Sequence, residues 1–197
     1  MANTHKAVVV AWGLTGVASL LVALAVIAVC WVLNPWFVFW EDAFSDFGGL
    51  RACCPWLYNW GLIFSALLLL AFSLYVYRVA RHKVEAFASA LLLVSAIFLA
   101  FIGVFPSGTR PHTFVSTWFF VQVYMAFAAI GVGMYVQGAR LGGALVTVLA
   151  LSSPFIGLLV EVLHGWPSAA VAEAVGIAVI GVLLAASTSF YVKRGLS

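Results

Sequence analysis

Apolar residues fill six long stretches of this chain, and polar residues are concentrated in the segments between them. A helix needs about 20 residues to cross the roughly 30 Å hydrocarbon core of a bilayer, and each stretch is long enough. The pattern predicts an all-α, multi-pass membrane bundle of six transmembrane helices, forming a single domain over residues 1–197. The predicted spans are Val8–Leu33, Tyr58–Val79, Val84–Phe105, Thr113–Gln137, Leu141–Leu163 and Ser168–Val192.

Composition supports this prediction, because 65% of the residues are hydrophobic and only 8% are charged, which leaves no room for a soluble domain. The net charge of +3 comes from short basic segments and not from a continuous basic face, so we expect no nucleic-acid binding. These segments are the two termini and the second and fourth loops, with Lys6, Arg78, Arg81, Lys83, Arg140, Lys193 and Arg194. The positive-inside rule therefore predicts that both termini are cytoplasmic and that the protein resides in the cell membrane.

The first outer loop, residues 34–55, is the longest connection and is rich in aromatic side chains. Loops of this length are often functional. Because the loop is too apolar to float in water, we expect it to lie along the membrane interface as a short amphipathic helix, with Ser45 and Asp46 leading into a Gly-Gly turn. Most of the tryptophans, Trp118 among them, lie on the same outer side, which fits an interfacial belt or an aromatic vestibule.

Polar residues at or inside the span ends are also concentrated on the predicted outer half. Glu173 lies within the sixth span, where a carboxylate is costly unless it faces protein or water. His112 opens the fourth span, and Ser116 follows one turn later on the same helix face. Glu161 and His164 are three residues apart near the outer end of the fifth span, so they share a face.

One interpretation of this cluster is a catalytic or binding site for a lipid or isoprenoid at the outer leaflet, without a cofactor. His112 would act as general base or acid, Glu173 or Asp46 would orient it, and water or a serine would attack a lipid ester or phosphoester. The protein would then be an intramembrane hydrolase or transferase. Candidate substrate contacts are Ser45, Asn59, Ser116 and Trp118.

Two other interpretations remain open. His112, Glu161 and His164 are suitable ligands for a divalent metal, and two histidines can ligate a haem for electron transfer. Alternatively, the polar groups only join helices, and the protein is a non-catalytic scaffold. Membrane lipids are the expected partners in each case, and small residues such as Gly131 and Gly133 permit a homo-oligomer without requiring one.

Three cysteines, Cys30, Cys53 and Cys54, lie on the predicted outer side. A disulfide from Cys30 to either neighbour would tie the long loop to the bundle and leave one thiol over. Three free thiols are the alternative.

Three short motifs follow one another along the chain: Phe44-Ser45-Asp46-Phe47-Gly48, Leu57-Tyr58-Asn59-Trp60-Gly61-Leu62-Ile63, and Phe101-Ile102-Gly103-Val104-Phe105-Pro106 with His112 after it. They resemble the landmarks of the domain of unknown function 998 family, six-span membrane proteins of bacteria and archaea. The chain is also similar to the Frag/DRAM/Sfk group, which includes a factor linked to remodelling of lipid anchors. The resemblance implies the six-span architecture and selects Ser45, Asn59, His112 and Glu173, but it names no reaction.

Overall fold

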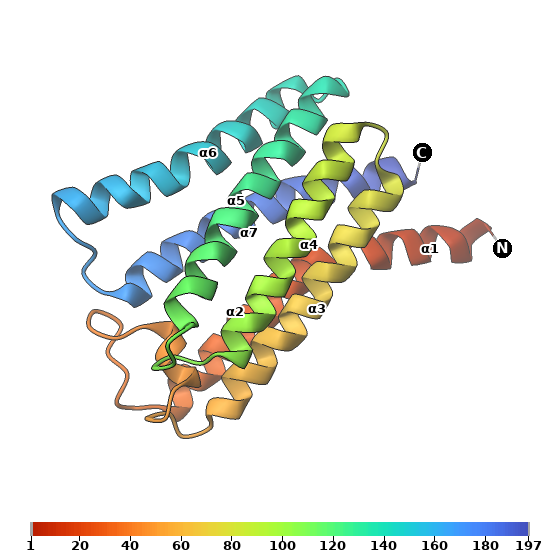
Figure 1. The fold of residues 1–197 in the computed structure, drawn as a ribbon. Coiled ribbons are helices and arrows are strands. Elements are labelled where there is room, and N and C mark those ends of the chain that lie inside the picture. The colour runs from red at the N-terminus through yellow and green to blue at the C-terminus, as the bar shows by residue number, and fades with distance from the viewer. Residues whose placement is uncertain (1, 197) are drawn as a thin grey trace.

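The computed structural model describes residues 2–196, and the regular elements of this part of the chain are all helices. Six of them are long and apolar enough to cross a membrane, which confirms the predicted six-span architecture. They form one bundle (Figure 1). Their bounds are α2 Thr15–Leu33, α3 Pro55–Val79, α4 Lys83–Val104, α5 His112–Val136, α6 Arg140–Leu163 and α7 Ala169–Gly195.

The first predicted span is divided, because a separate helix, α1 (Ala2–Gly13), precedes α2. The break follows Gly13, whose backbone lies against α3 and α7. A Cβ atom at this position would lie 2.9 Å from the ring of Tyr75 and would also strike Val192. The separation of α1 from α2 therefore coincides with contacts to residues far away in the sequence.

The bundle has two ends, which we name by their connections. The loop end carries the long segment 34–54, and the turn end carries the short turns at 80–82 and 137–139 together with the C-terminus. Figure 1 shows α1 at the turn end, near the C-terminus. The predicted cytoplasmic location of the turn end rests on its basic residues alone.

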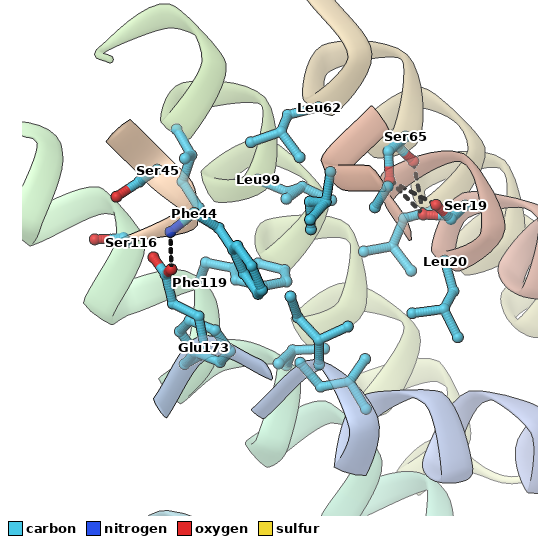
Figure 2. A pocket seen from close by; sticks show the side chains of 18 of the residues that line it. Ser19, Leu20, Phe44, Ser45, Leu62, Ser65, Leu99, Ser116, Phe119 and Glu173 are labelled. Atoms are coloured by element: carbon cyan, nitrogen blue, oxygen red, sulfur yellow. Dashed lines mark hydrogen bonds between the residues drawn. The ribbon is translucent and has the colours of Figure 1, made fainter. Parts of the chain in front are cut away.

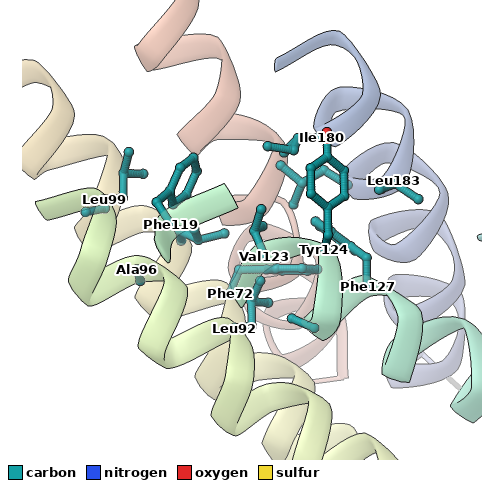
Figure 3. Close-up of a cluster of buried hydrophobic side chains, with 14 of the residues drawn as sticks. Phe72, Leu92, Ala96, Leu99, Phe119, Val123, Tyr124, Phe127, Ile180 and Leu183 are labelled. Carbon is teal, nitrogen blue, oxygen red and sulfur yellow. The ribbon is translucent and has the colours of Figure 1, made fainter. Parts of the chain in front are cut away.

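Helices α3, α4, α5 and α7 meet in a core of large apolar side chains (Figure 3). Phe72, Leu92, Val123, Phe127 and Leu183 are fully buried there. Because lipid tails are as apolar as these side chains, close packing rather than exclusion of water is expected to stabilise helix association in a membrane.

Helix α6 packs against α5 only through its first half. Gly131 and Gly143 allow the two backbones to approach, since a Cβ atom at Gly131 would lie 2.6 Å from the backbone nitrogen of Thr147. Beyond Ala150, α6 has no buried residue, and Phe155 is 70% exposed. Figure 1 shows α6 diverging from α5 towards the loop end.

The loop prediction needs a correction. Residues Phe44–Gly48 form a short 3₁₀ helix, η1, but this helix does not lie along the surface. Phe44 and Phe47 are three residues apart and therefore share one side of a 3₁₀ helix. Both are buried, and the Phe47 ring centre lies 4.5 Å from that of Phe37. Because these rings are packed inside the end of the bundle, we call η1 the plug.

Candidate functional site

A central cavity of about 90 Å³ lies beneath the plug and is lined by residues from the plug and from α2, α3, α4, α5 and α7 (Figure 2). Most of its lining is apolar, as with Leu62, Leu99 and Ile180. Ser19 and Ser65 also line it, and each hydroxyl donates to the other residue's carbonyl oxygen at 2.8 Å. Since one water needs roughly 10–15 Å³ of such space, the cavity has room for several waters or part of a larger ligand.

Four residues that the sequence singled out line this same cavity: Ser45, His112, Ser116 and Glu173. They come from the plug, the first turn and a half of α5, and the early part of α7. Figure 2 shows Ser45, Ser116 and Glu173 close to one another. The cavity therefore combines a polar loop-end part with a largely apolar remainder.

Glu173 is held by the backbone of the plug. Its Oε2 atom accepts a hydrogen bond from the Phe44 N–H at 2.6 Å, and Ser45 also faces the carboxylate. The N-terminus of α7 is fixed to the same loop, because Ser168 caps the helix and its hydroxyl donates to the Phe39 carbonyl at 2.6 Å. Among residues 2–196, no lysine, arginine or histidine forms an ion pair with Glu173.

His112 is oriented by a backbone carbonyl and not by either predicted carboxylate. Its Nδ1 atom lies 2.8 Å from the carbonyl oxygen of Phe105. A carbonyl can only accept a hydrogen bond, so Nδ1 carries the proton, and Nε2 is the basic nitrogen of the neutral ring.

Asp46 and Asn59 hold the plug and do not line the cavity. The Asp46 carboxylate accepts from the Ala43 N–H at 3.0 Å and from the Ser107 hydroxyl at 2.8 Å. Asn59 donates from Nδ2 to the Gly48 carbonyl at 3.1 Å. A Cβ atom at Gly48 would collide with the Asn59 amide oxygen, so this contact requires glycine.

Trp118, Glu161 and His164 lie apart from the cavity lining. The Trp118 side chain is 39% exposed and packs on Phe114. Glu161 and His164 are exposed at the end of α6, which diverges from the bundle. In the described part of the chain, no three His, Cys, Asp or Glu side chains are grouped so that they could share a metal ion. The predicted metal ligands His112, Glu161 and His164 therefore do not come together.

Sequence reasoning missed Asn34, which organises the long loop. The residue is 2% exposed, and its Nδ2 donates to the Cys30 carbonyl at 2.7 Å. Its Oδ1 accepts from the Cys53 N–H at 2.8 Å and from the Trp36 indole at 3.0 Å. The Asn-Pro pair at the end of the first apolar stretch is a turn signal that could have drawn attention to it. Cys30, Cys53 and Cys54 are all free thiols.

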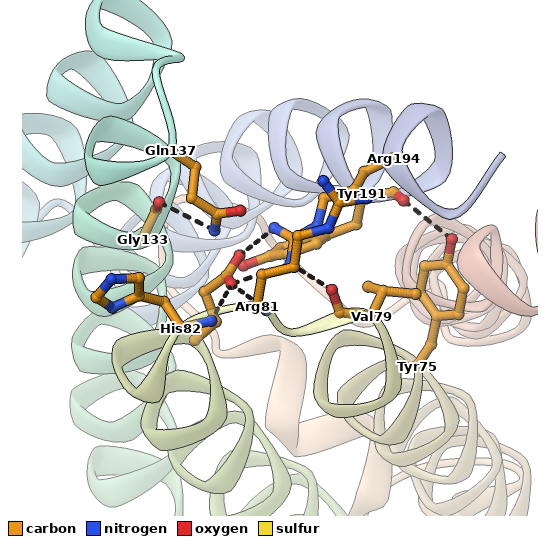
Figure 4. A network of polar contacts seen from close by, with 9 residues as sticks. Tyr75, Val79, Arg81, His82, Gly133, Gln137, Tyr191 and Arg194 are labelled. Atoms are coloured by element: carbon orange, nitrogen blue, oxygen red, sulfur yellow. Dashed lines mark hydrogen bonds and ion pairs between the residues drawn. The ribbon is translucent and has the colours of Figure 1, made fainter. Parts of the chain in front are cut away.

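A fully buried carboxylate, Glu85, lies near the start of α4 at the turn end. It belongs to a network of polar contacts that includes Arg81, His82 and Arg194 (Figure 4). Its Oε1 atom lies 2.6 Å from Nη1 of Arg194, and its Oε2 atom accepts from the N–H groups of Arg81 and His82. Arg194 also donates to the Val79 carbonyl. This network joins the C-terminal end of α7 to the α3–α4 turn, and the sequence analysis did not single it out.

The family model described as "Protein of unknown function (DUF998)" matches residues 17–189. The chain belongs to this family. The matched range contains the plug and every residue that lines the cavity. No curated protein and no solved structure matches the chain.

Proposed function

We propose that this DUF998 protein binds a membrane lipid or isoprenoid in the central cavity. The apolar chain would lie along the deep part of the cavity, and the polar head would lie beside Ser45, His112, Ser116 and Glu173. The observation that carries the proposal is that one cavity within a membrane-spanning bundle is lined by apolar side chains in its deep part and by polar side chains at the loop end.

The head group is expected to determine selectivity. An apolar chain gains little by leaving the equally apolar bilayer, so polar contacts must distinguish one lipid from another. The carboxylate of Glu173 and Nε2 of His112 are hydrogen-bond acceptors, and an acidic side chain disfavours an anionic group beside it. We therefore favour a head that presents a hydroxyl or ammonium donor to Glu173.

Binding is the part of the proposal that needs no activated serine, and within residues 2–196 His112 is not paired with one. Activation of a serine requires a hydrogen bond between its hydroxyl and a general base. The Ser116 hydroxyl instead donates to the backbone carbonyls of His112 and Thr113. Within residues 2–196, no hydrogen bond joins the His112 ring to Ser45 or Ser116.

The binding proposal can be tested by filling the cavity. Ala23 lines it, whereas Ala25 is an exposed alanine of the same helix that does not. Mass spectrometry of lipids extracted from purified protein should find a stoichiometric lipid in the wild type and in Ala25→Phe. Ala23→Phe should lose it by about tenfold, equivalent to ~1.4 kcal/mol of binding free energy. Equal lipid content in all three proteins would contradict the proposal.

The proposal also places the polar end of the cavity at the outer leaflet, which the native cysteines can test. Cys53 is exposed at the loop end. Its neighbour Cys54 is less suited to labelling, because a hydrogen bond with Cys53 raises the pKa of the Cys54 thiol. A variant with Cys30→Ser and Cys54→Ser leaves Cys53 as the single thiol. A membrane-impermeant maleimide should label it on intact cells, and labelling only after lysis would reverse the orientation.

A further inference from the structure

A second hollow, a groove of about 490 Å³, lies between α2 and α7. It is lined only by apolar and small residues, among them Leu24, Ala178 and Val182. Both helices are loosely packed. In the apolar 18-residue stretch of each helix, 22% of the residues are buried inside the protein, against 44% to 50% in α3, α4 and α5. The groove is therefore a feature of the least enclosed pair of neighbouring spans around the cavity.

The groove and the central cavity share four wall residues: Leu20, Ile27, Phe44 and Ile177. A side chain that borders both hollows is the partition between them. Figure 2 shows Leu20 and Phe44 at the cavity. Rotation of such side chains opens a passage without breaking a backbone hydrogen bond.

The α7 side of the groove is smooth. Ala174, Ala178, Gly181 and Ala185 recur at intervals of three and four residues and therefore share one helix face. No water is present at hydrocarbon depth, so an apolar groove that faces the bilayer there is filled by lipid chains. This identifies the chemistry of the occupant as the apolar chain of a membrane lipid.

We infer that the α2–α7 groove is the lateral entrance of the cavity, through which the chain of a membrane lipid passes from the bilayer. The inference rests on the proposed function. During entry the polar head would remain at the loop end and move past Phe44, whose N–H contacts Glu173. A lipid lying in the bilayer thus reaches the polar groups without its head crossing hydrocarbon.

The alternative entrance, through the plug, requires more disruption. Removing the plug would break the hydrogen bonds from Asn59 to Gly48 and from Ser107 to Asp46, and it would expose the buried ring of Phe47. The lateral route leaves all these contacts in place, which is why we favour it.

Photolabelling in proteoliposomes tests the entrance. The probe is phosphatidylethanolamine with a diazirine in its acyl chain, present in vesicles of phosphatidylethanolamine and phosphatidylglycerol. Leu62 and Leu69 line the cavity and are 5% and 3% exposed, so they report a chain inside the protein. Ala178→Trp, which fills the groove but not the cavity, should slow their labelling by about tenfold. Ala25→Trp, at an exposed site outside both hollows, should leave it unchanged.

The outcomes separate the two proposals. Absence of label at Leu62 and Leu69 in the wild type would overturn lipid binding in the cavity. Labelling that proceeds equally fast in the wild type and in Ala178→Trp would overturn the lateral entrance alone. Val182→Trp, at a groove position that is 59% exposed, is the second variant if Ala178→Trp does not fold, and the same slowing is expected.

Discussion

Two glutamates lie within the bundle at opposite ends, and their surroundings differ. Glu85 at the turn end is fully buried and faces the guanidinium of Arg194, whose side chain is 7% exposed. Glu173 at the loop end accepts a hydrogen bond from the Phe44 N–H and borders a cavity, and no cation of residues 2–196 pairs with it.

The difference separates a structural carboxylate from a candidate functional one. The Glu85 carboxylate is bound by Arg194, Arg81 and His82. Its side chain also leaves no room for a Cβ atom at Gly133, which would lie 2.7 Å from Glu85 Cγ. Glu173 has unfilled space beside it instead. A partly buried carboxylate without a cation, next to a cavity, is the arrangement expected where a ligand supplies the missing contacts.

The same conservative substitution at the two sites should have unequal effects, and the larger is expected for Glu85→Gln. It leaves Arg194 buried against a neutral amide, and breaking a buried ion pair costs about 3 kcal/mol or more. Thermal unfolding in detergent should show a large decrease in the midpoint temperature. Lys193→Gln, which removes the exposed charge next to Arg194, is the matched control and should change little.

A double variant sharpens this prediction. Glu85→Leu combined with Arg194→Leu removes both charges, and replacement of a whole buried pair is often nearly neutral. The double variant should therefore be more stable than Glu85→Gln. If it is less stable, the Glu85–Arg194 network contributes more to the stability of the protein than the pairing of two opposite charges.

Glu173→Gln should change stability little and ligand binding more. The amide oxygen can still accept from the Phe44 N–H, so we expect a loss of less than about 1 kcal/mol in unfolding free energy. Loss of the charge-assisted contact to a donor-bearing head should lower the content of co-purified lipid by about tenfold. A stability loss equal to that of Glu85→Gln would remove the distinction between the two carboxylates.

Gly48→Ala should displace the plug, with an expected cost of about 1–2 kcal/mol. The added methyl collides with the Asn59 amide oxygen and also approaches Tyr58 to 3.0 Å. Hydrogen exchange should increase for the amides of the plug and remain unchanged at the turn end. Adding Asn59→Ala removes the collision, so the double variant should recover part of the protection.

The smallest effect is expected for Ser107→Ala, which removes the hydrogen bond to Asp46. One such bond contributes about 1 kcal/mol. The same hydrogen-exchange measurement should show a modest local increase in the plug. Thr109→Ala removes an exposed hydroxyl of the same α4–α5 connection, which donates to the Pro106 carbonyl and not to the plug. It provides the control, for which no change in the exchange of the plug amides is expected.

Much of the fold could be predicted from the apolar pattern. The predicted ends of the last five spans lie within a few residues of α3 to α7, because apolar length and flanking polar residues mark where a helix leaves the hydrocarbon. The break before α2 could not be predicted, since Gly13 meets Tyr75 and Val192 only in the folded bundle.

The candidate site was only partly predictable. Glu173 can be identified from the sequence alone because a carboxylate inside a membrane span is costly, and His112 can be identified because it lies at the end of a predicted span. The same criteria also selected Glu161 and His164, which α6 carries away from the cavity. Their exclusion depends on where α6 leaves α5, which a hydropathy pattern does not report.

The sequence by itself determined that this chain spans a membrane, because about 20 apolar residues satisfy both the bilayer thickness and the backbone hydrogen bonds of a helix. Only the tertiary structure decided which polar groups share a space. Phe44 enters the bundle because its ring packs with other aromatic rings of the loop, and that burial brings its N–H to Glu173 across 129 residues of sequence. Such contacts depend on packing between segments that no local pattern encodes.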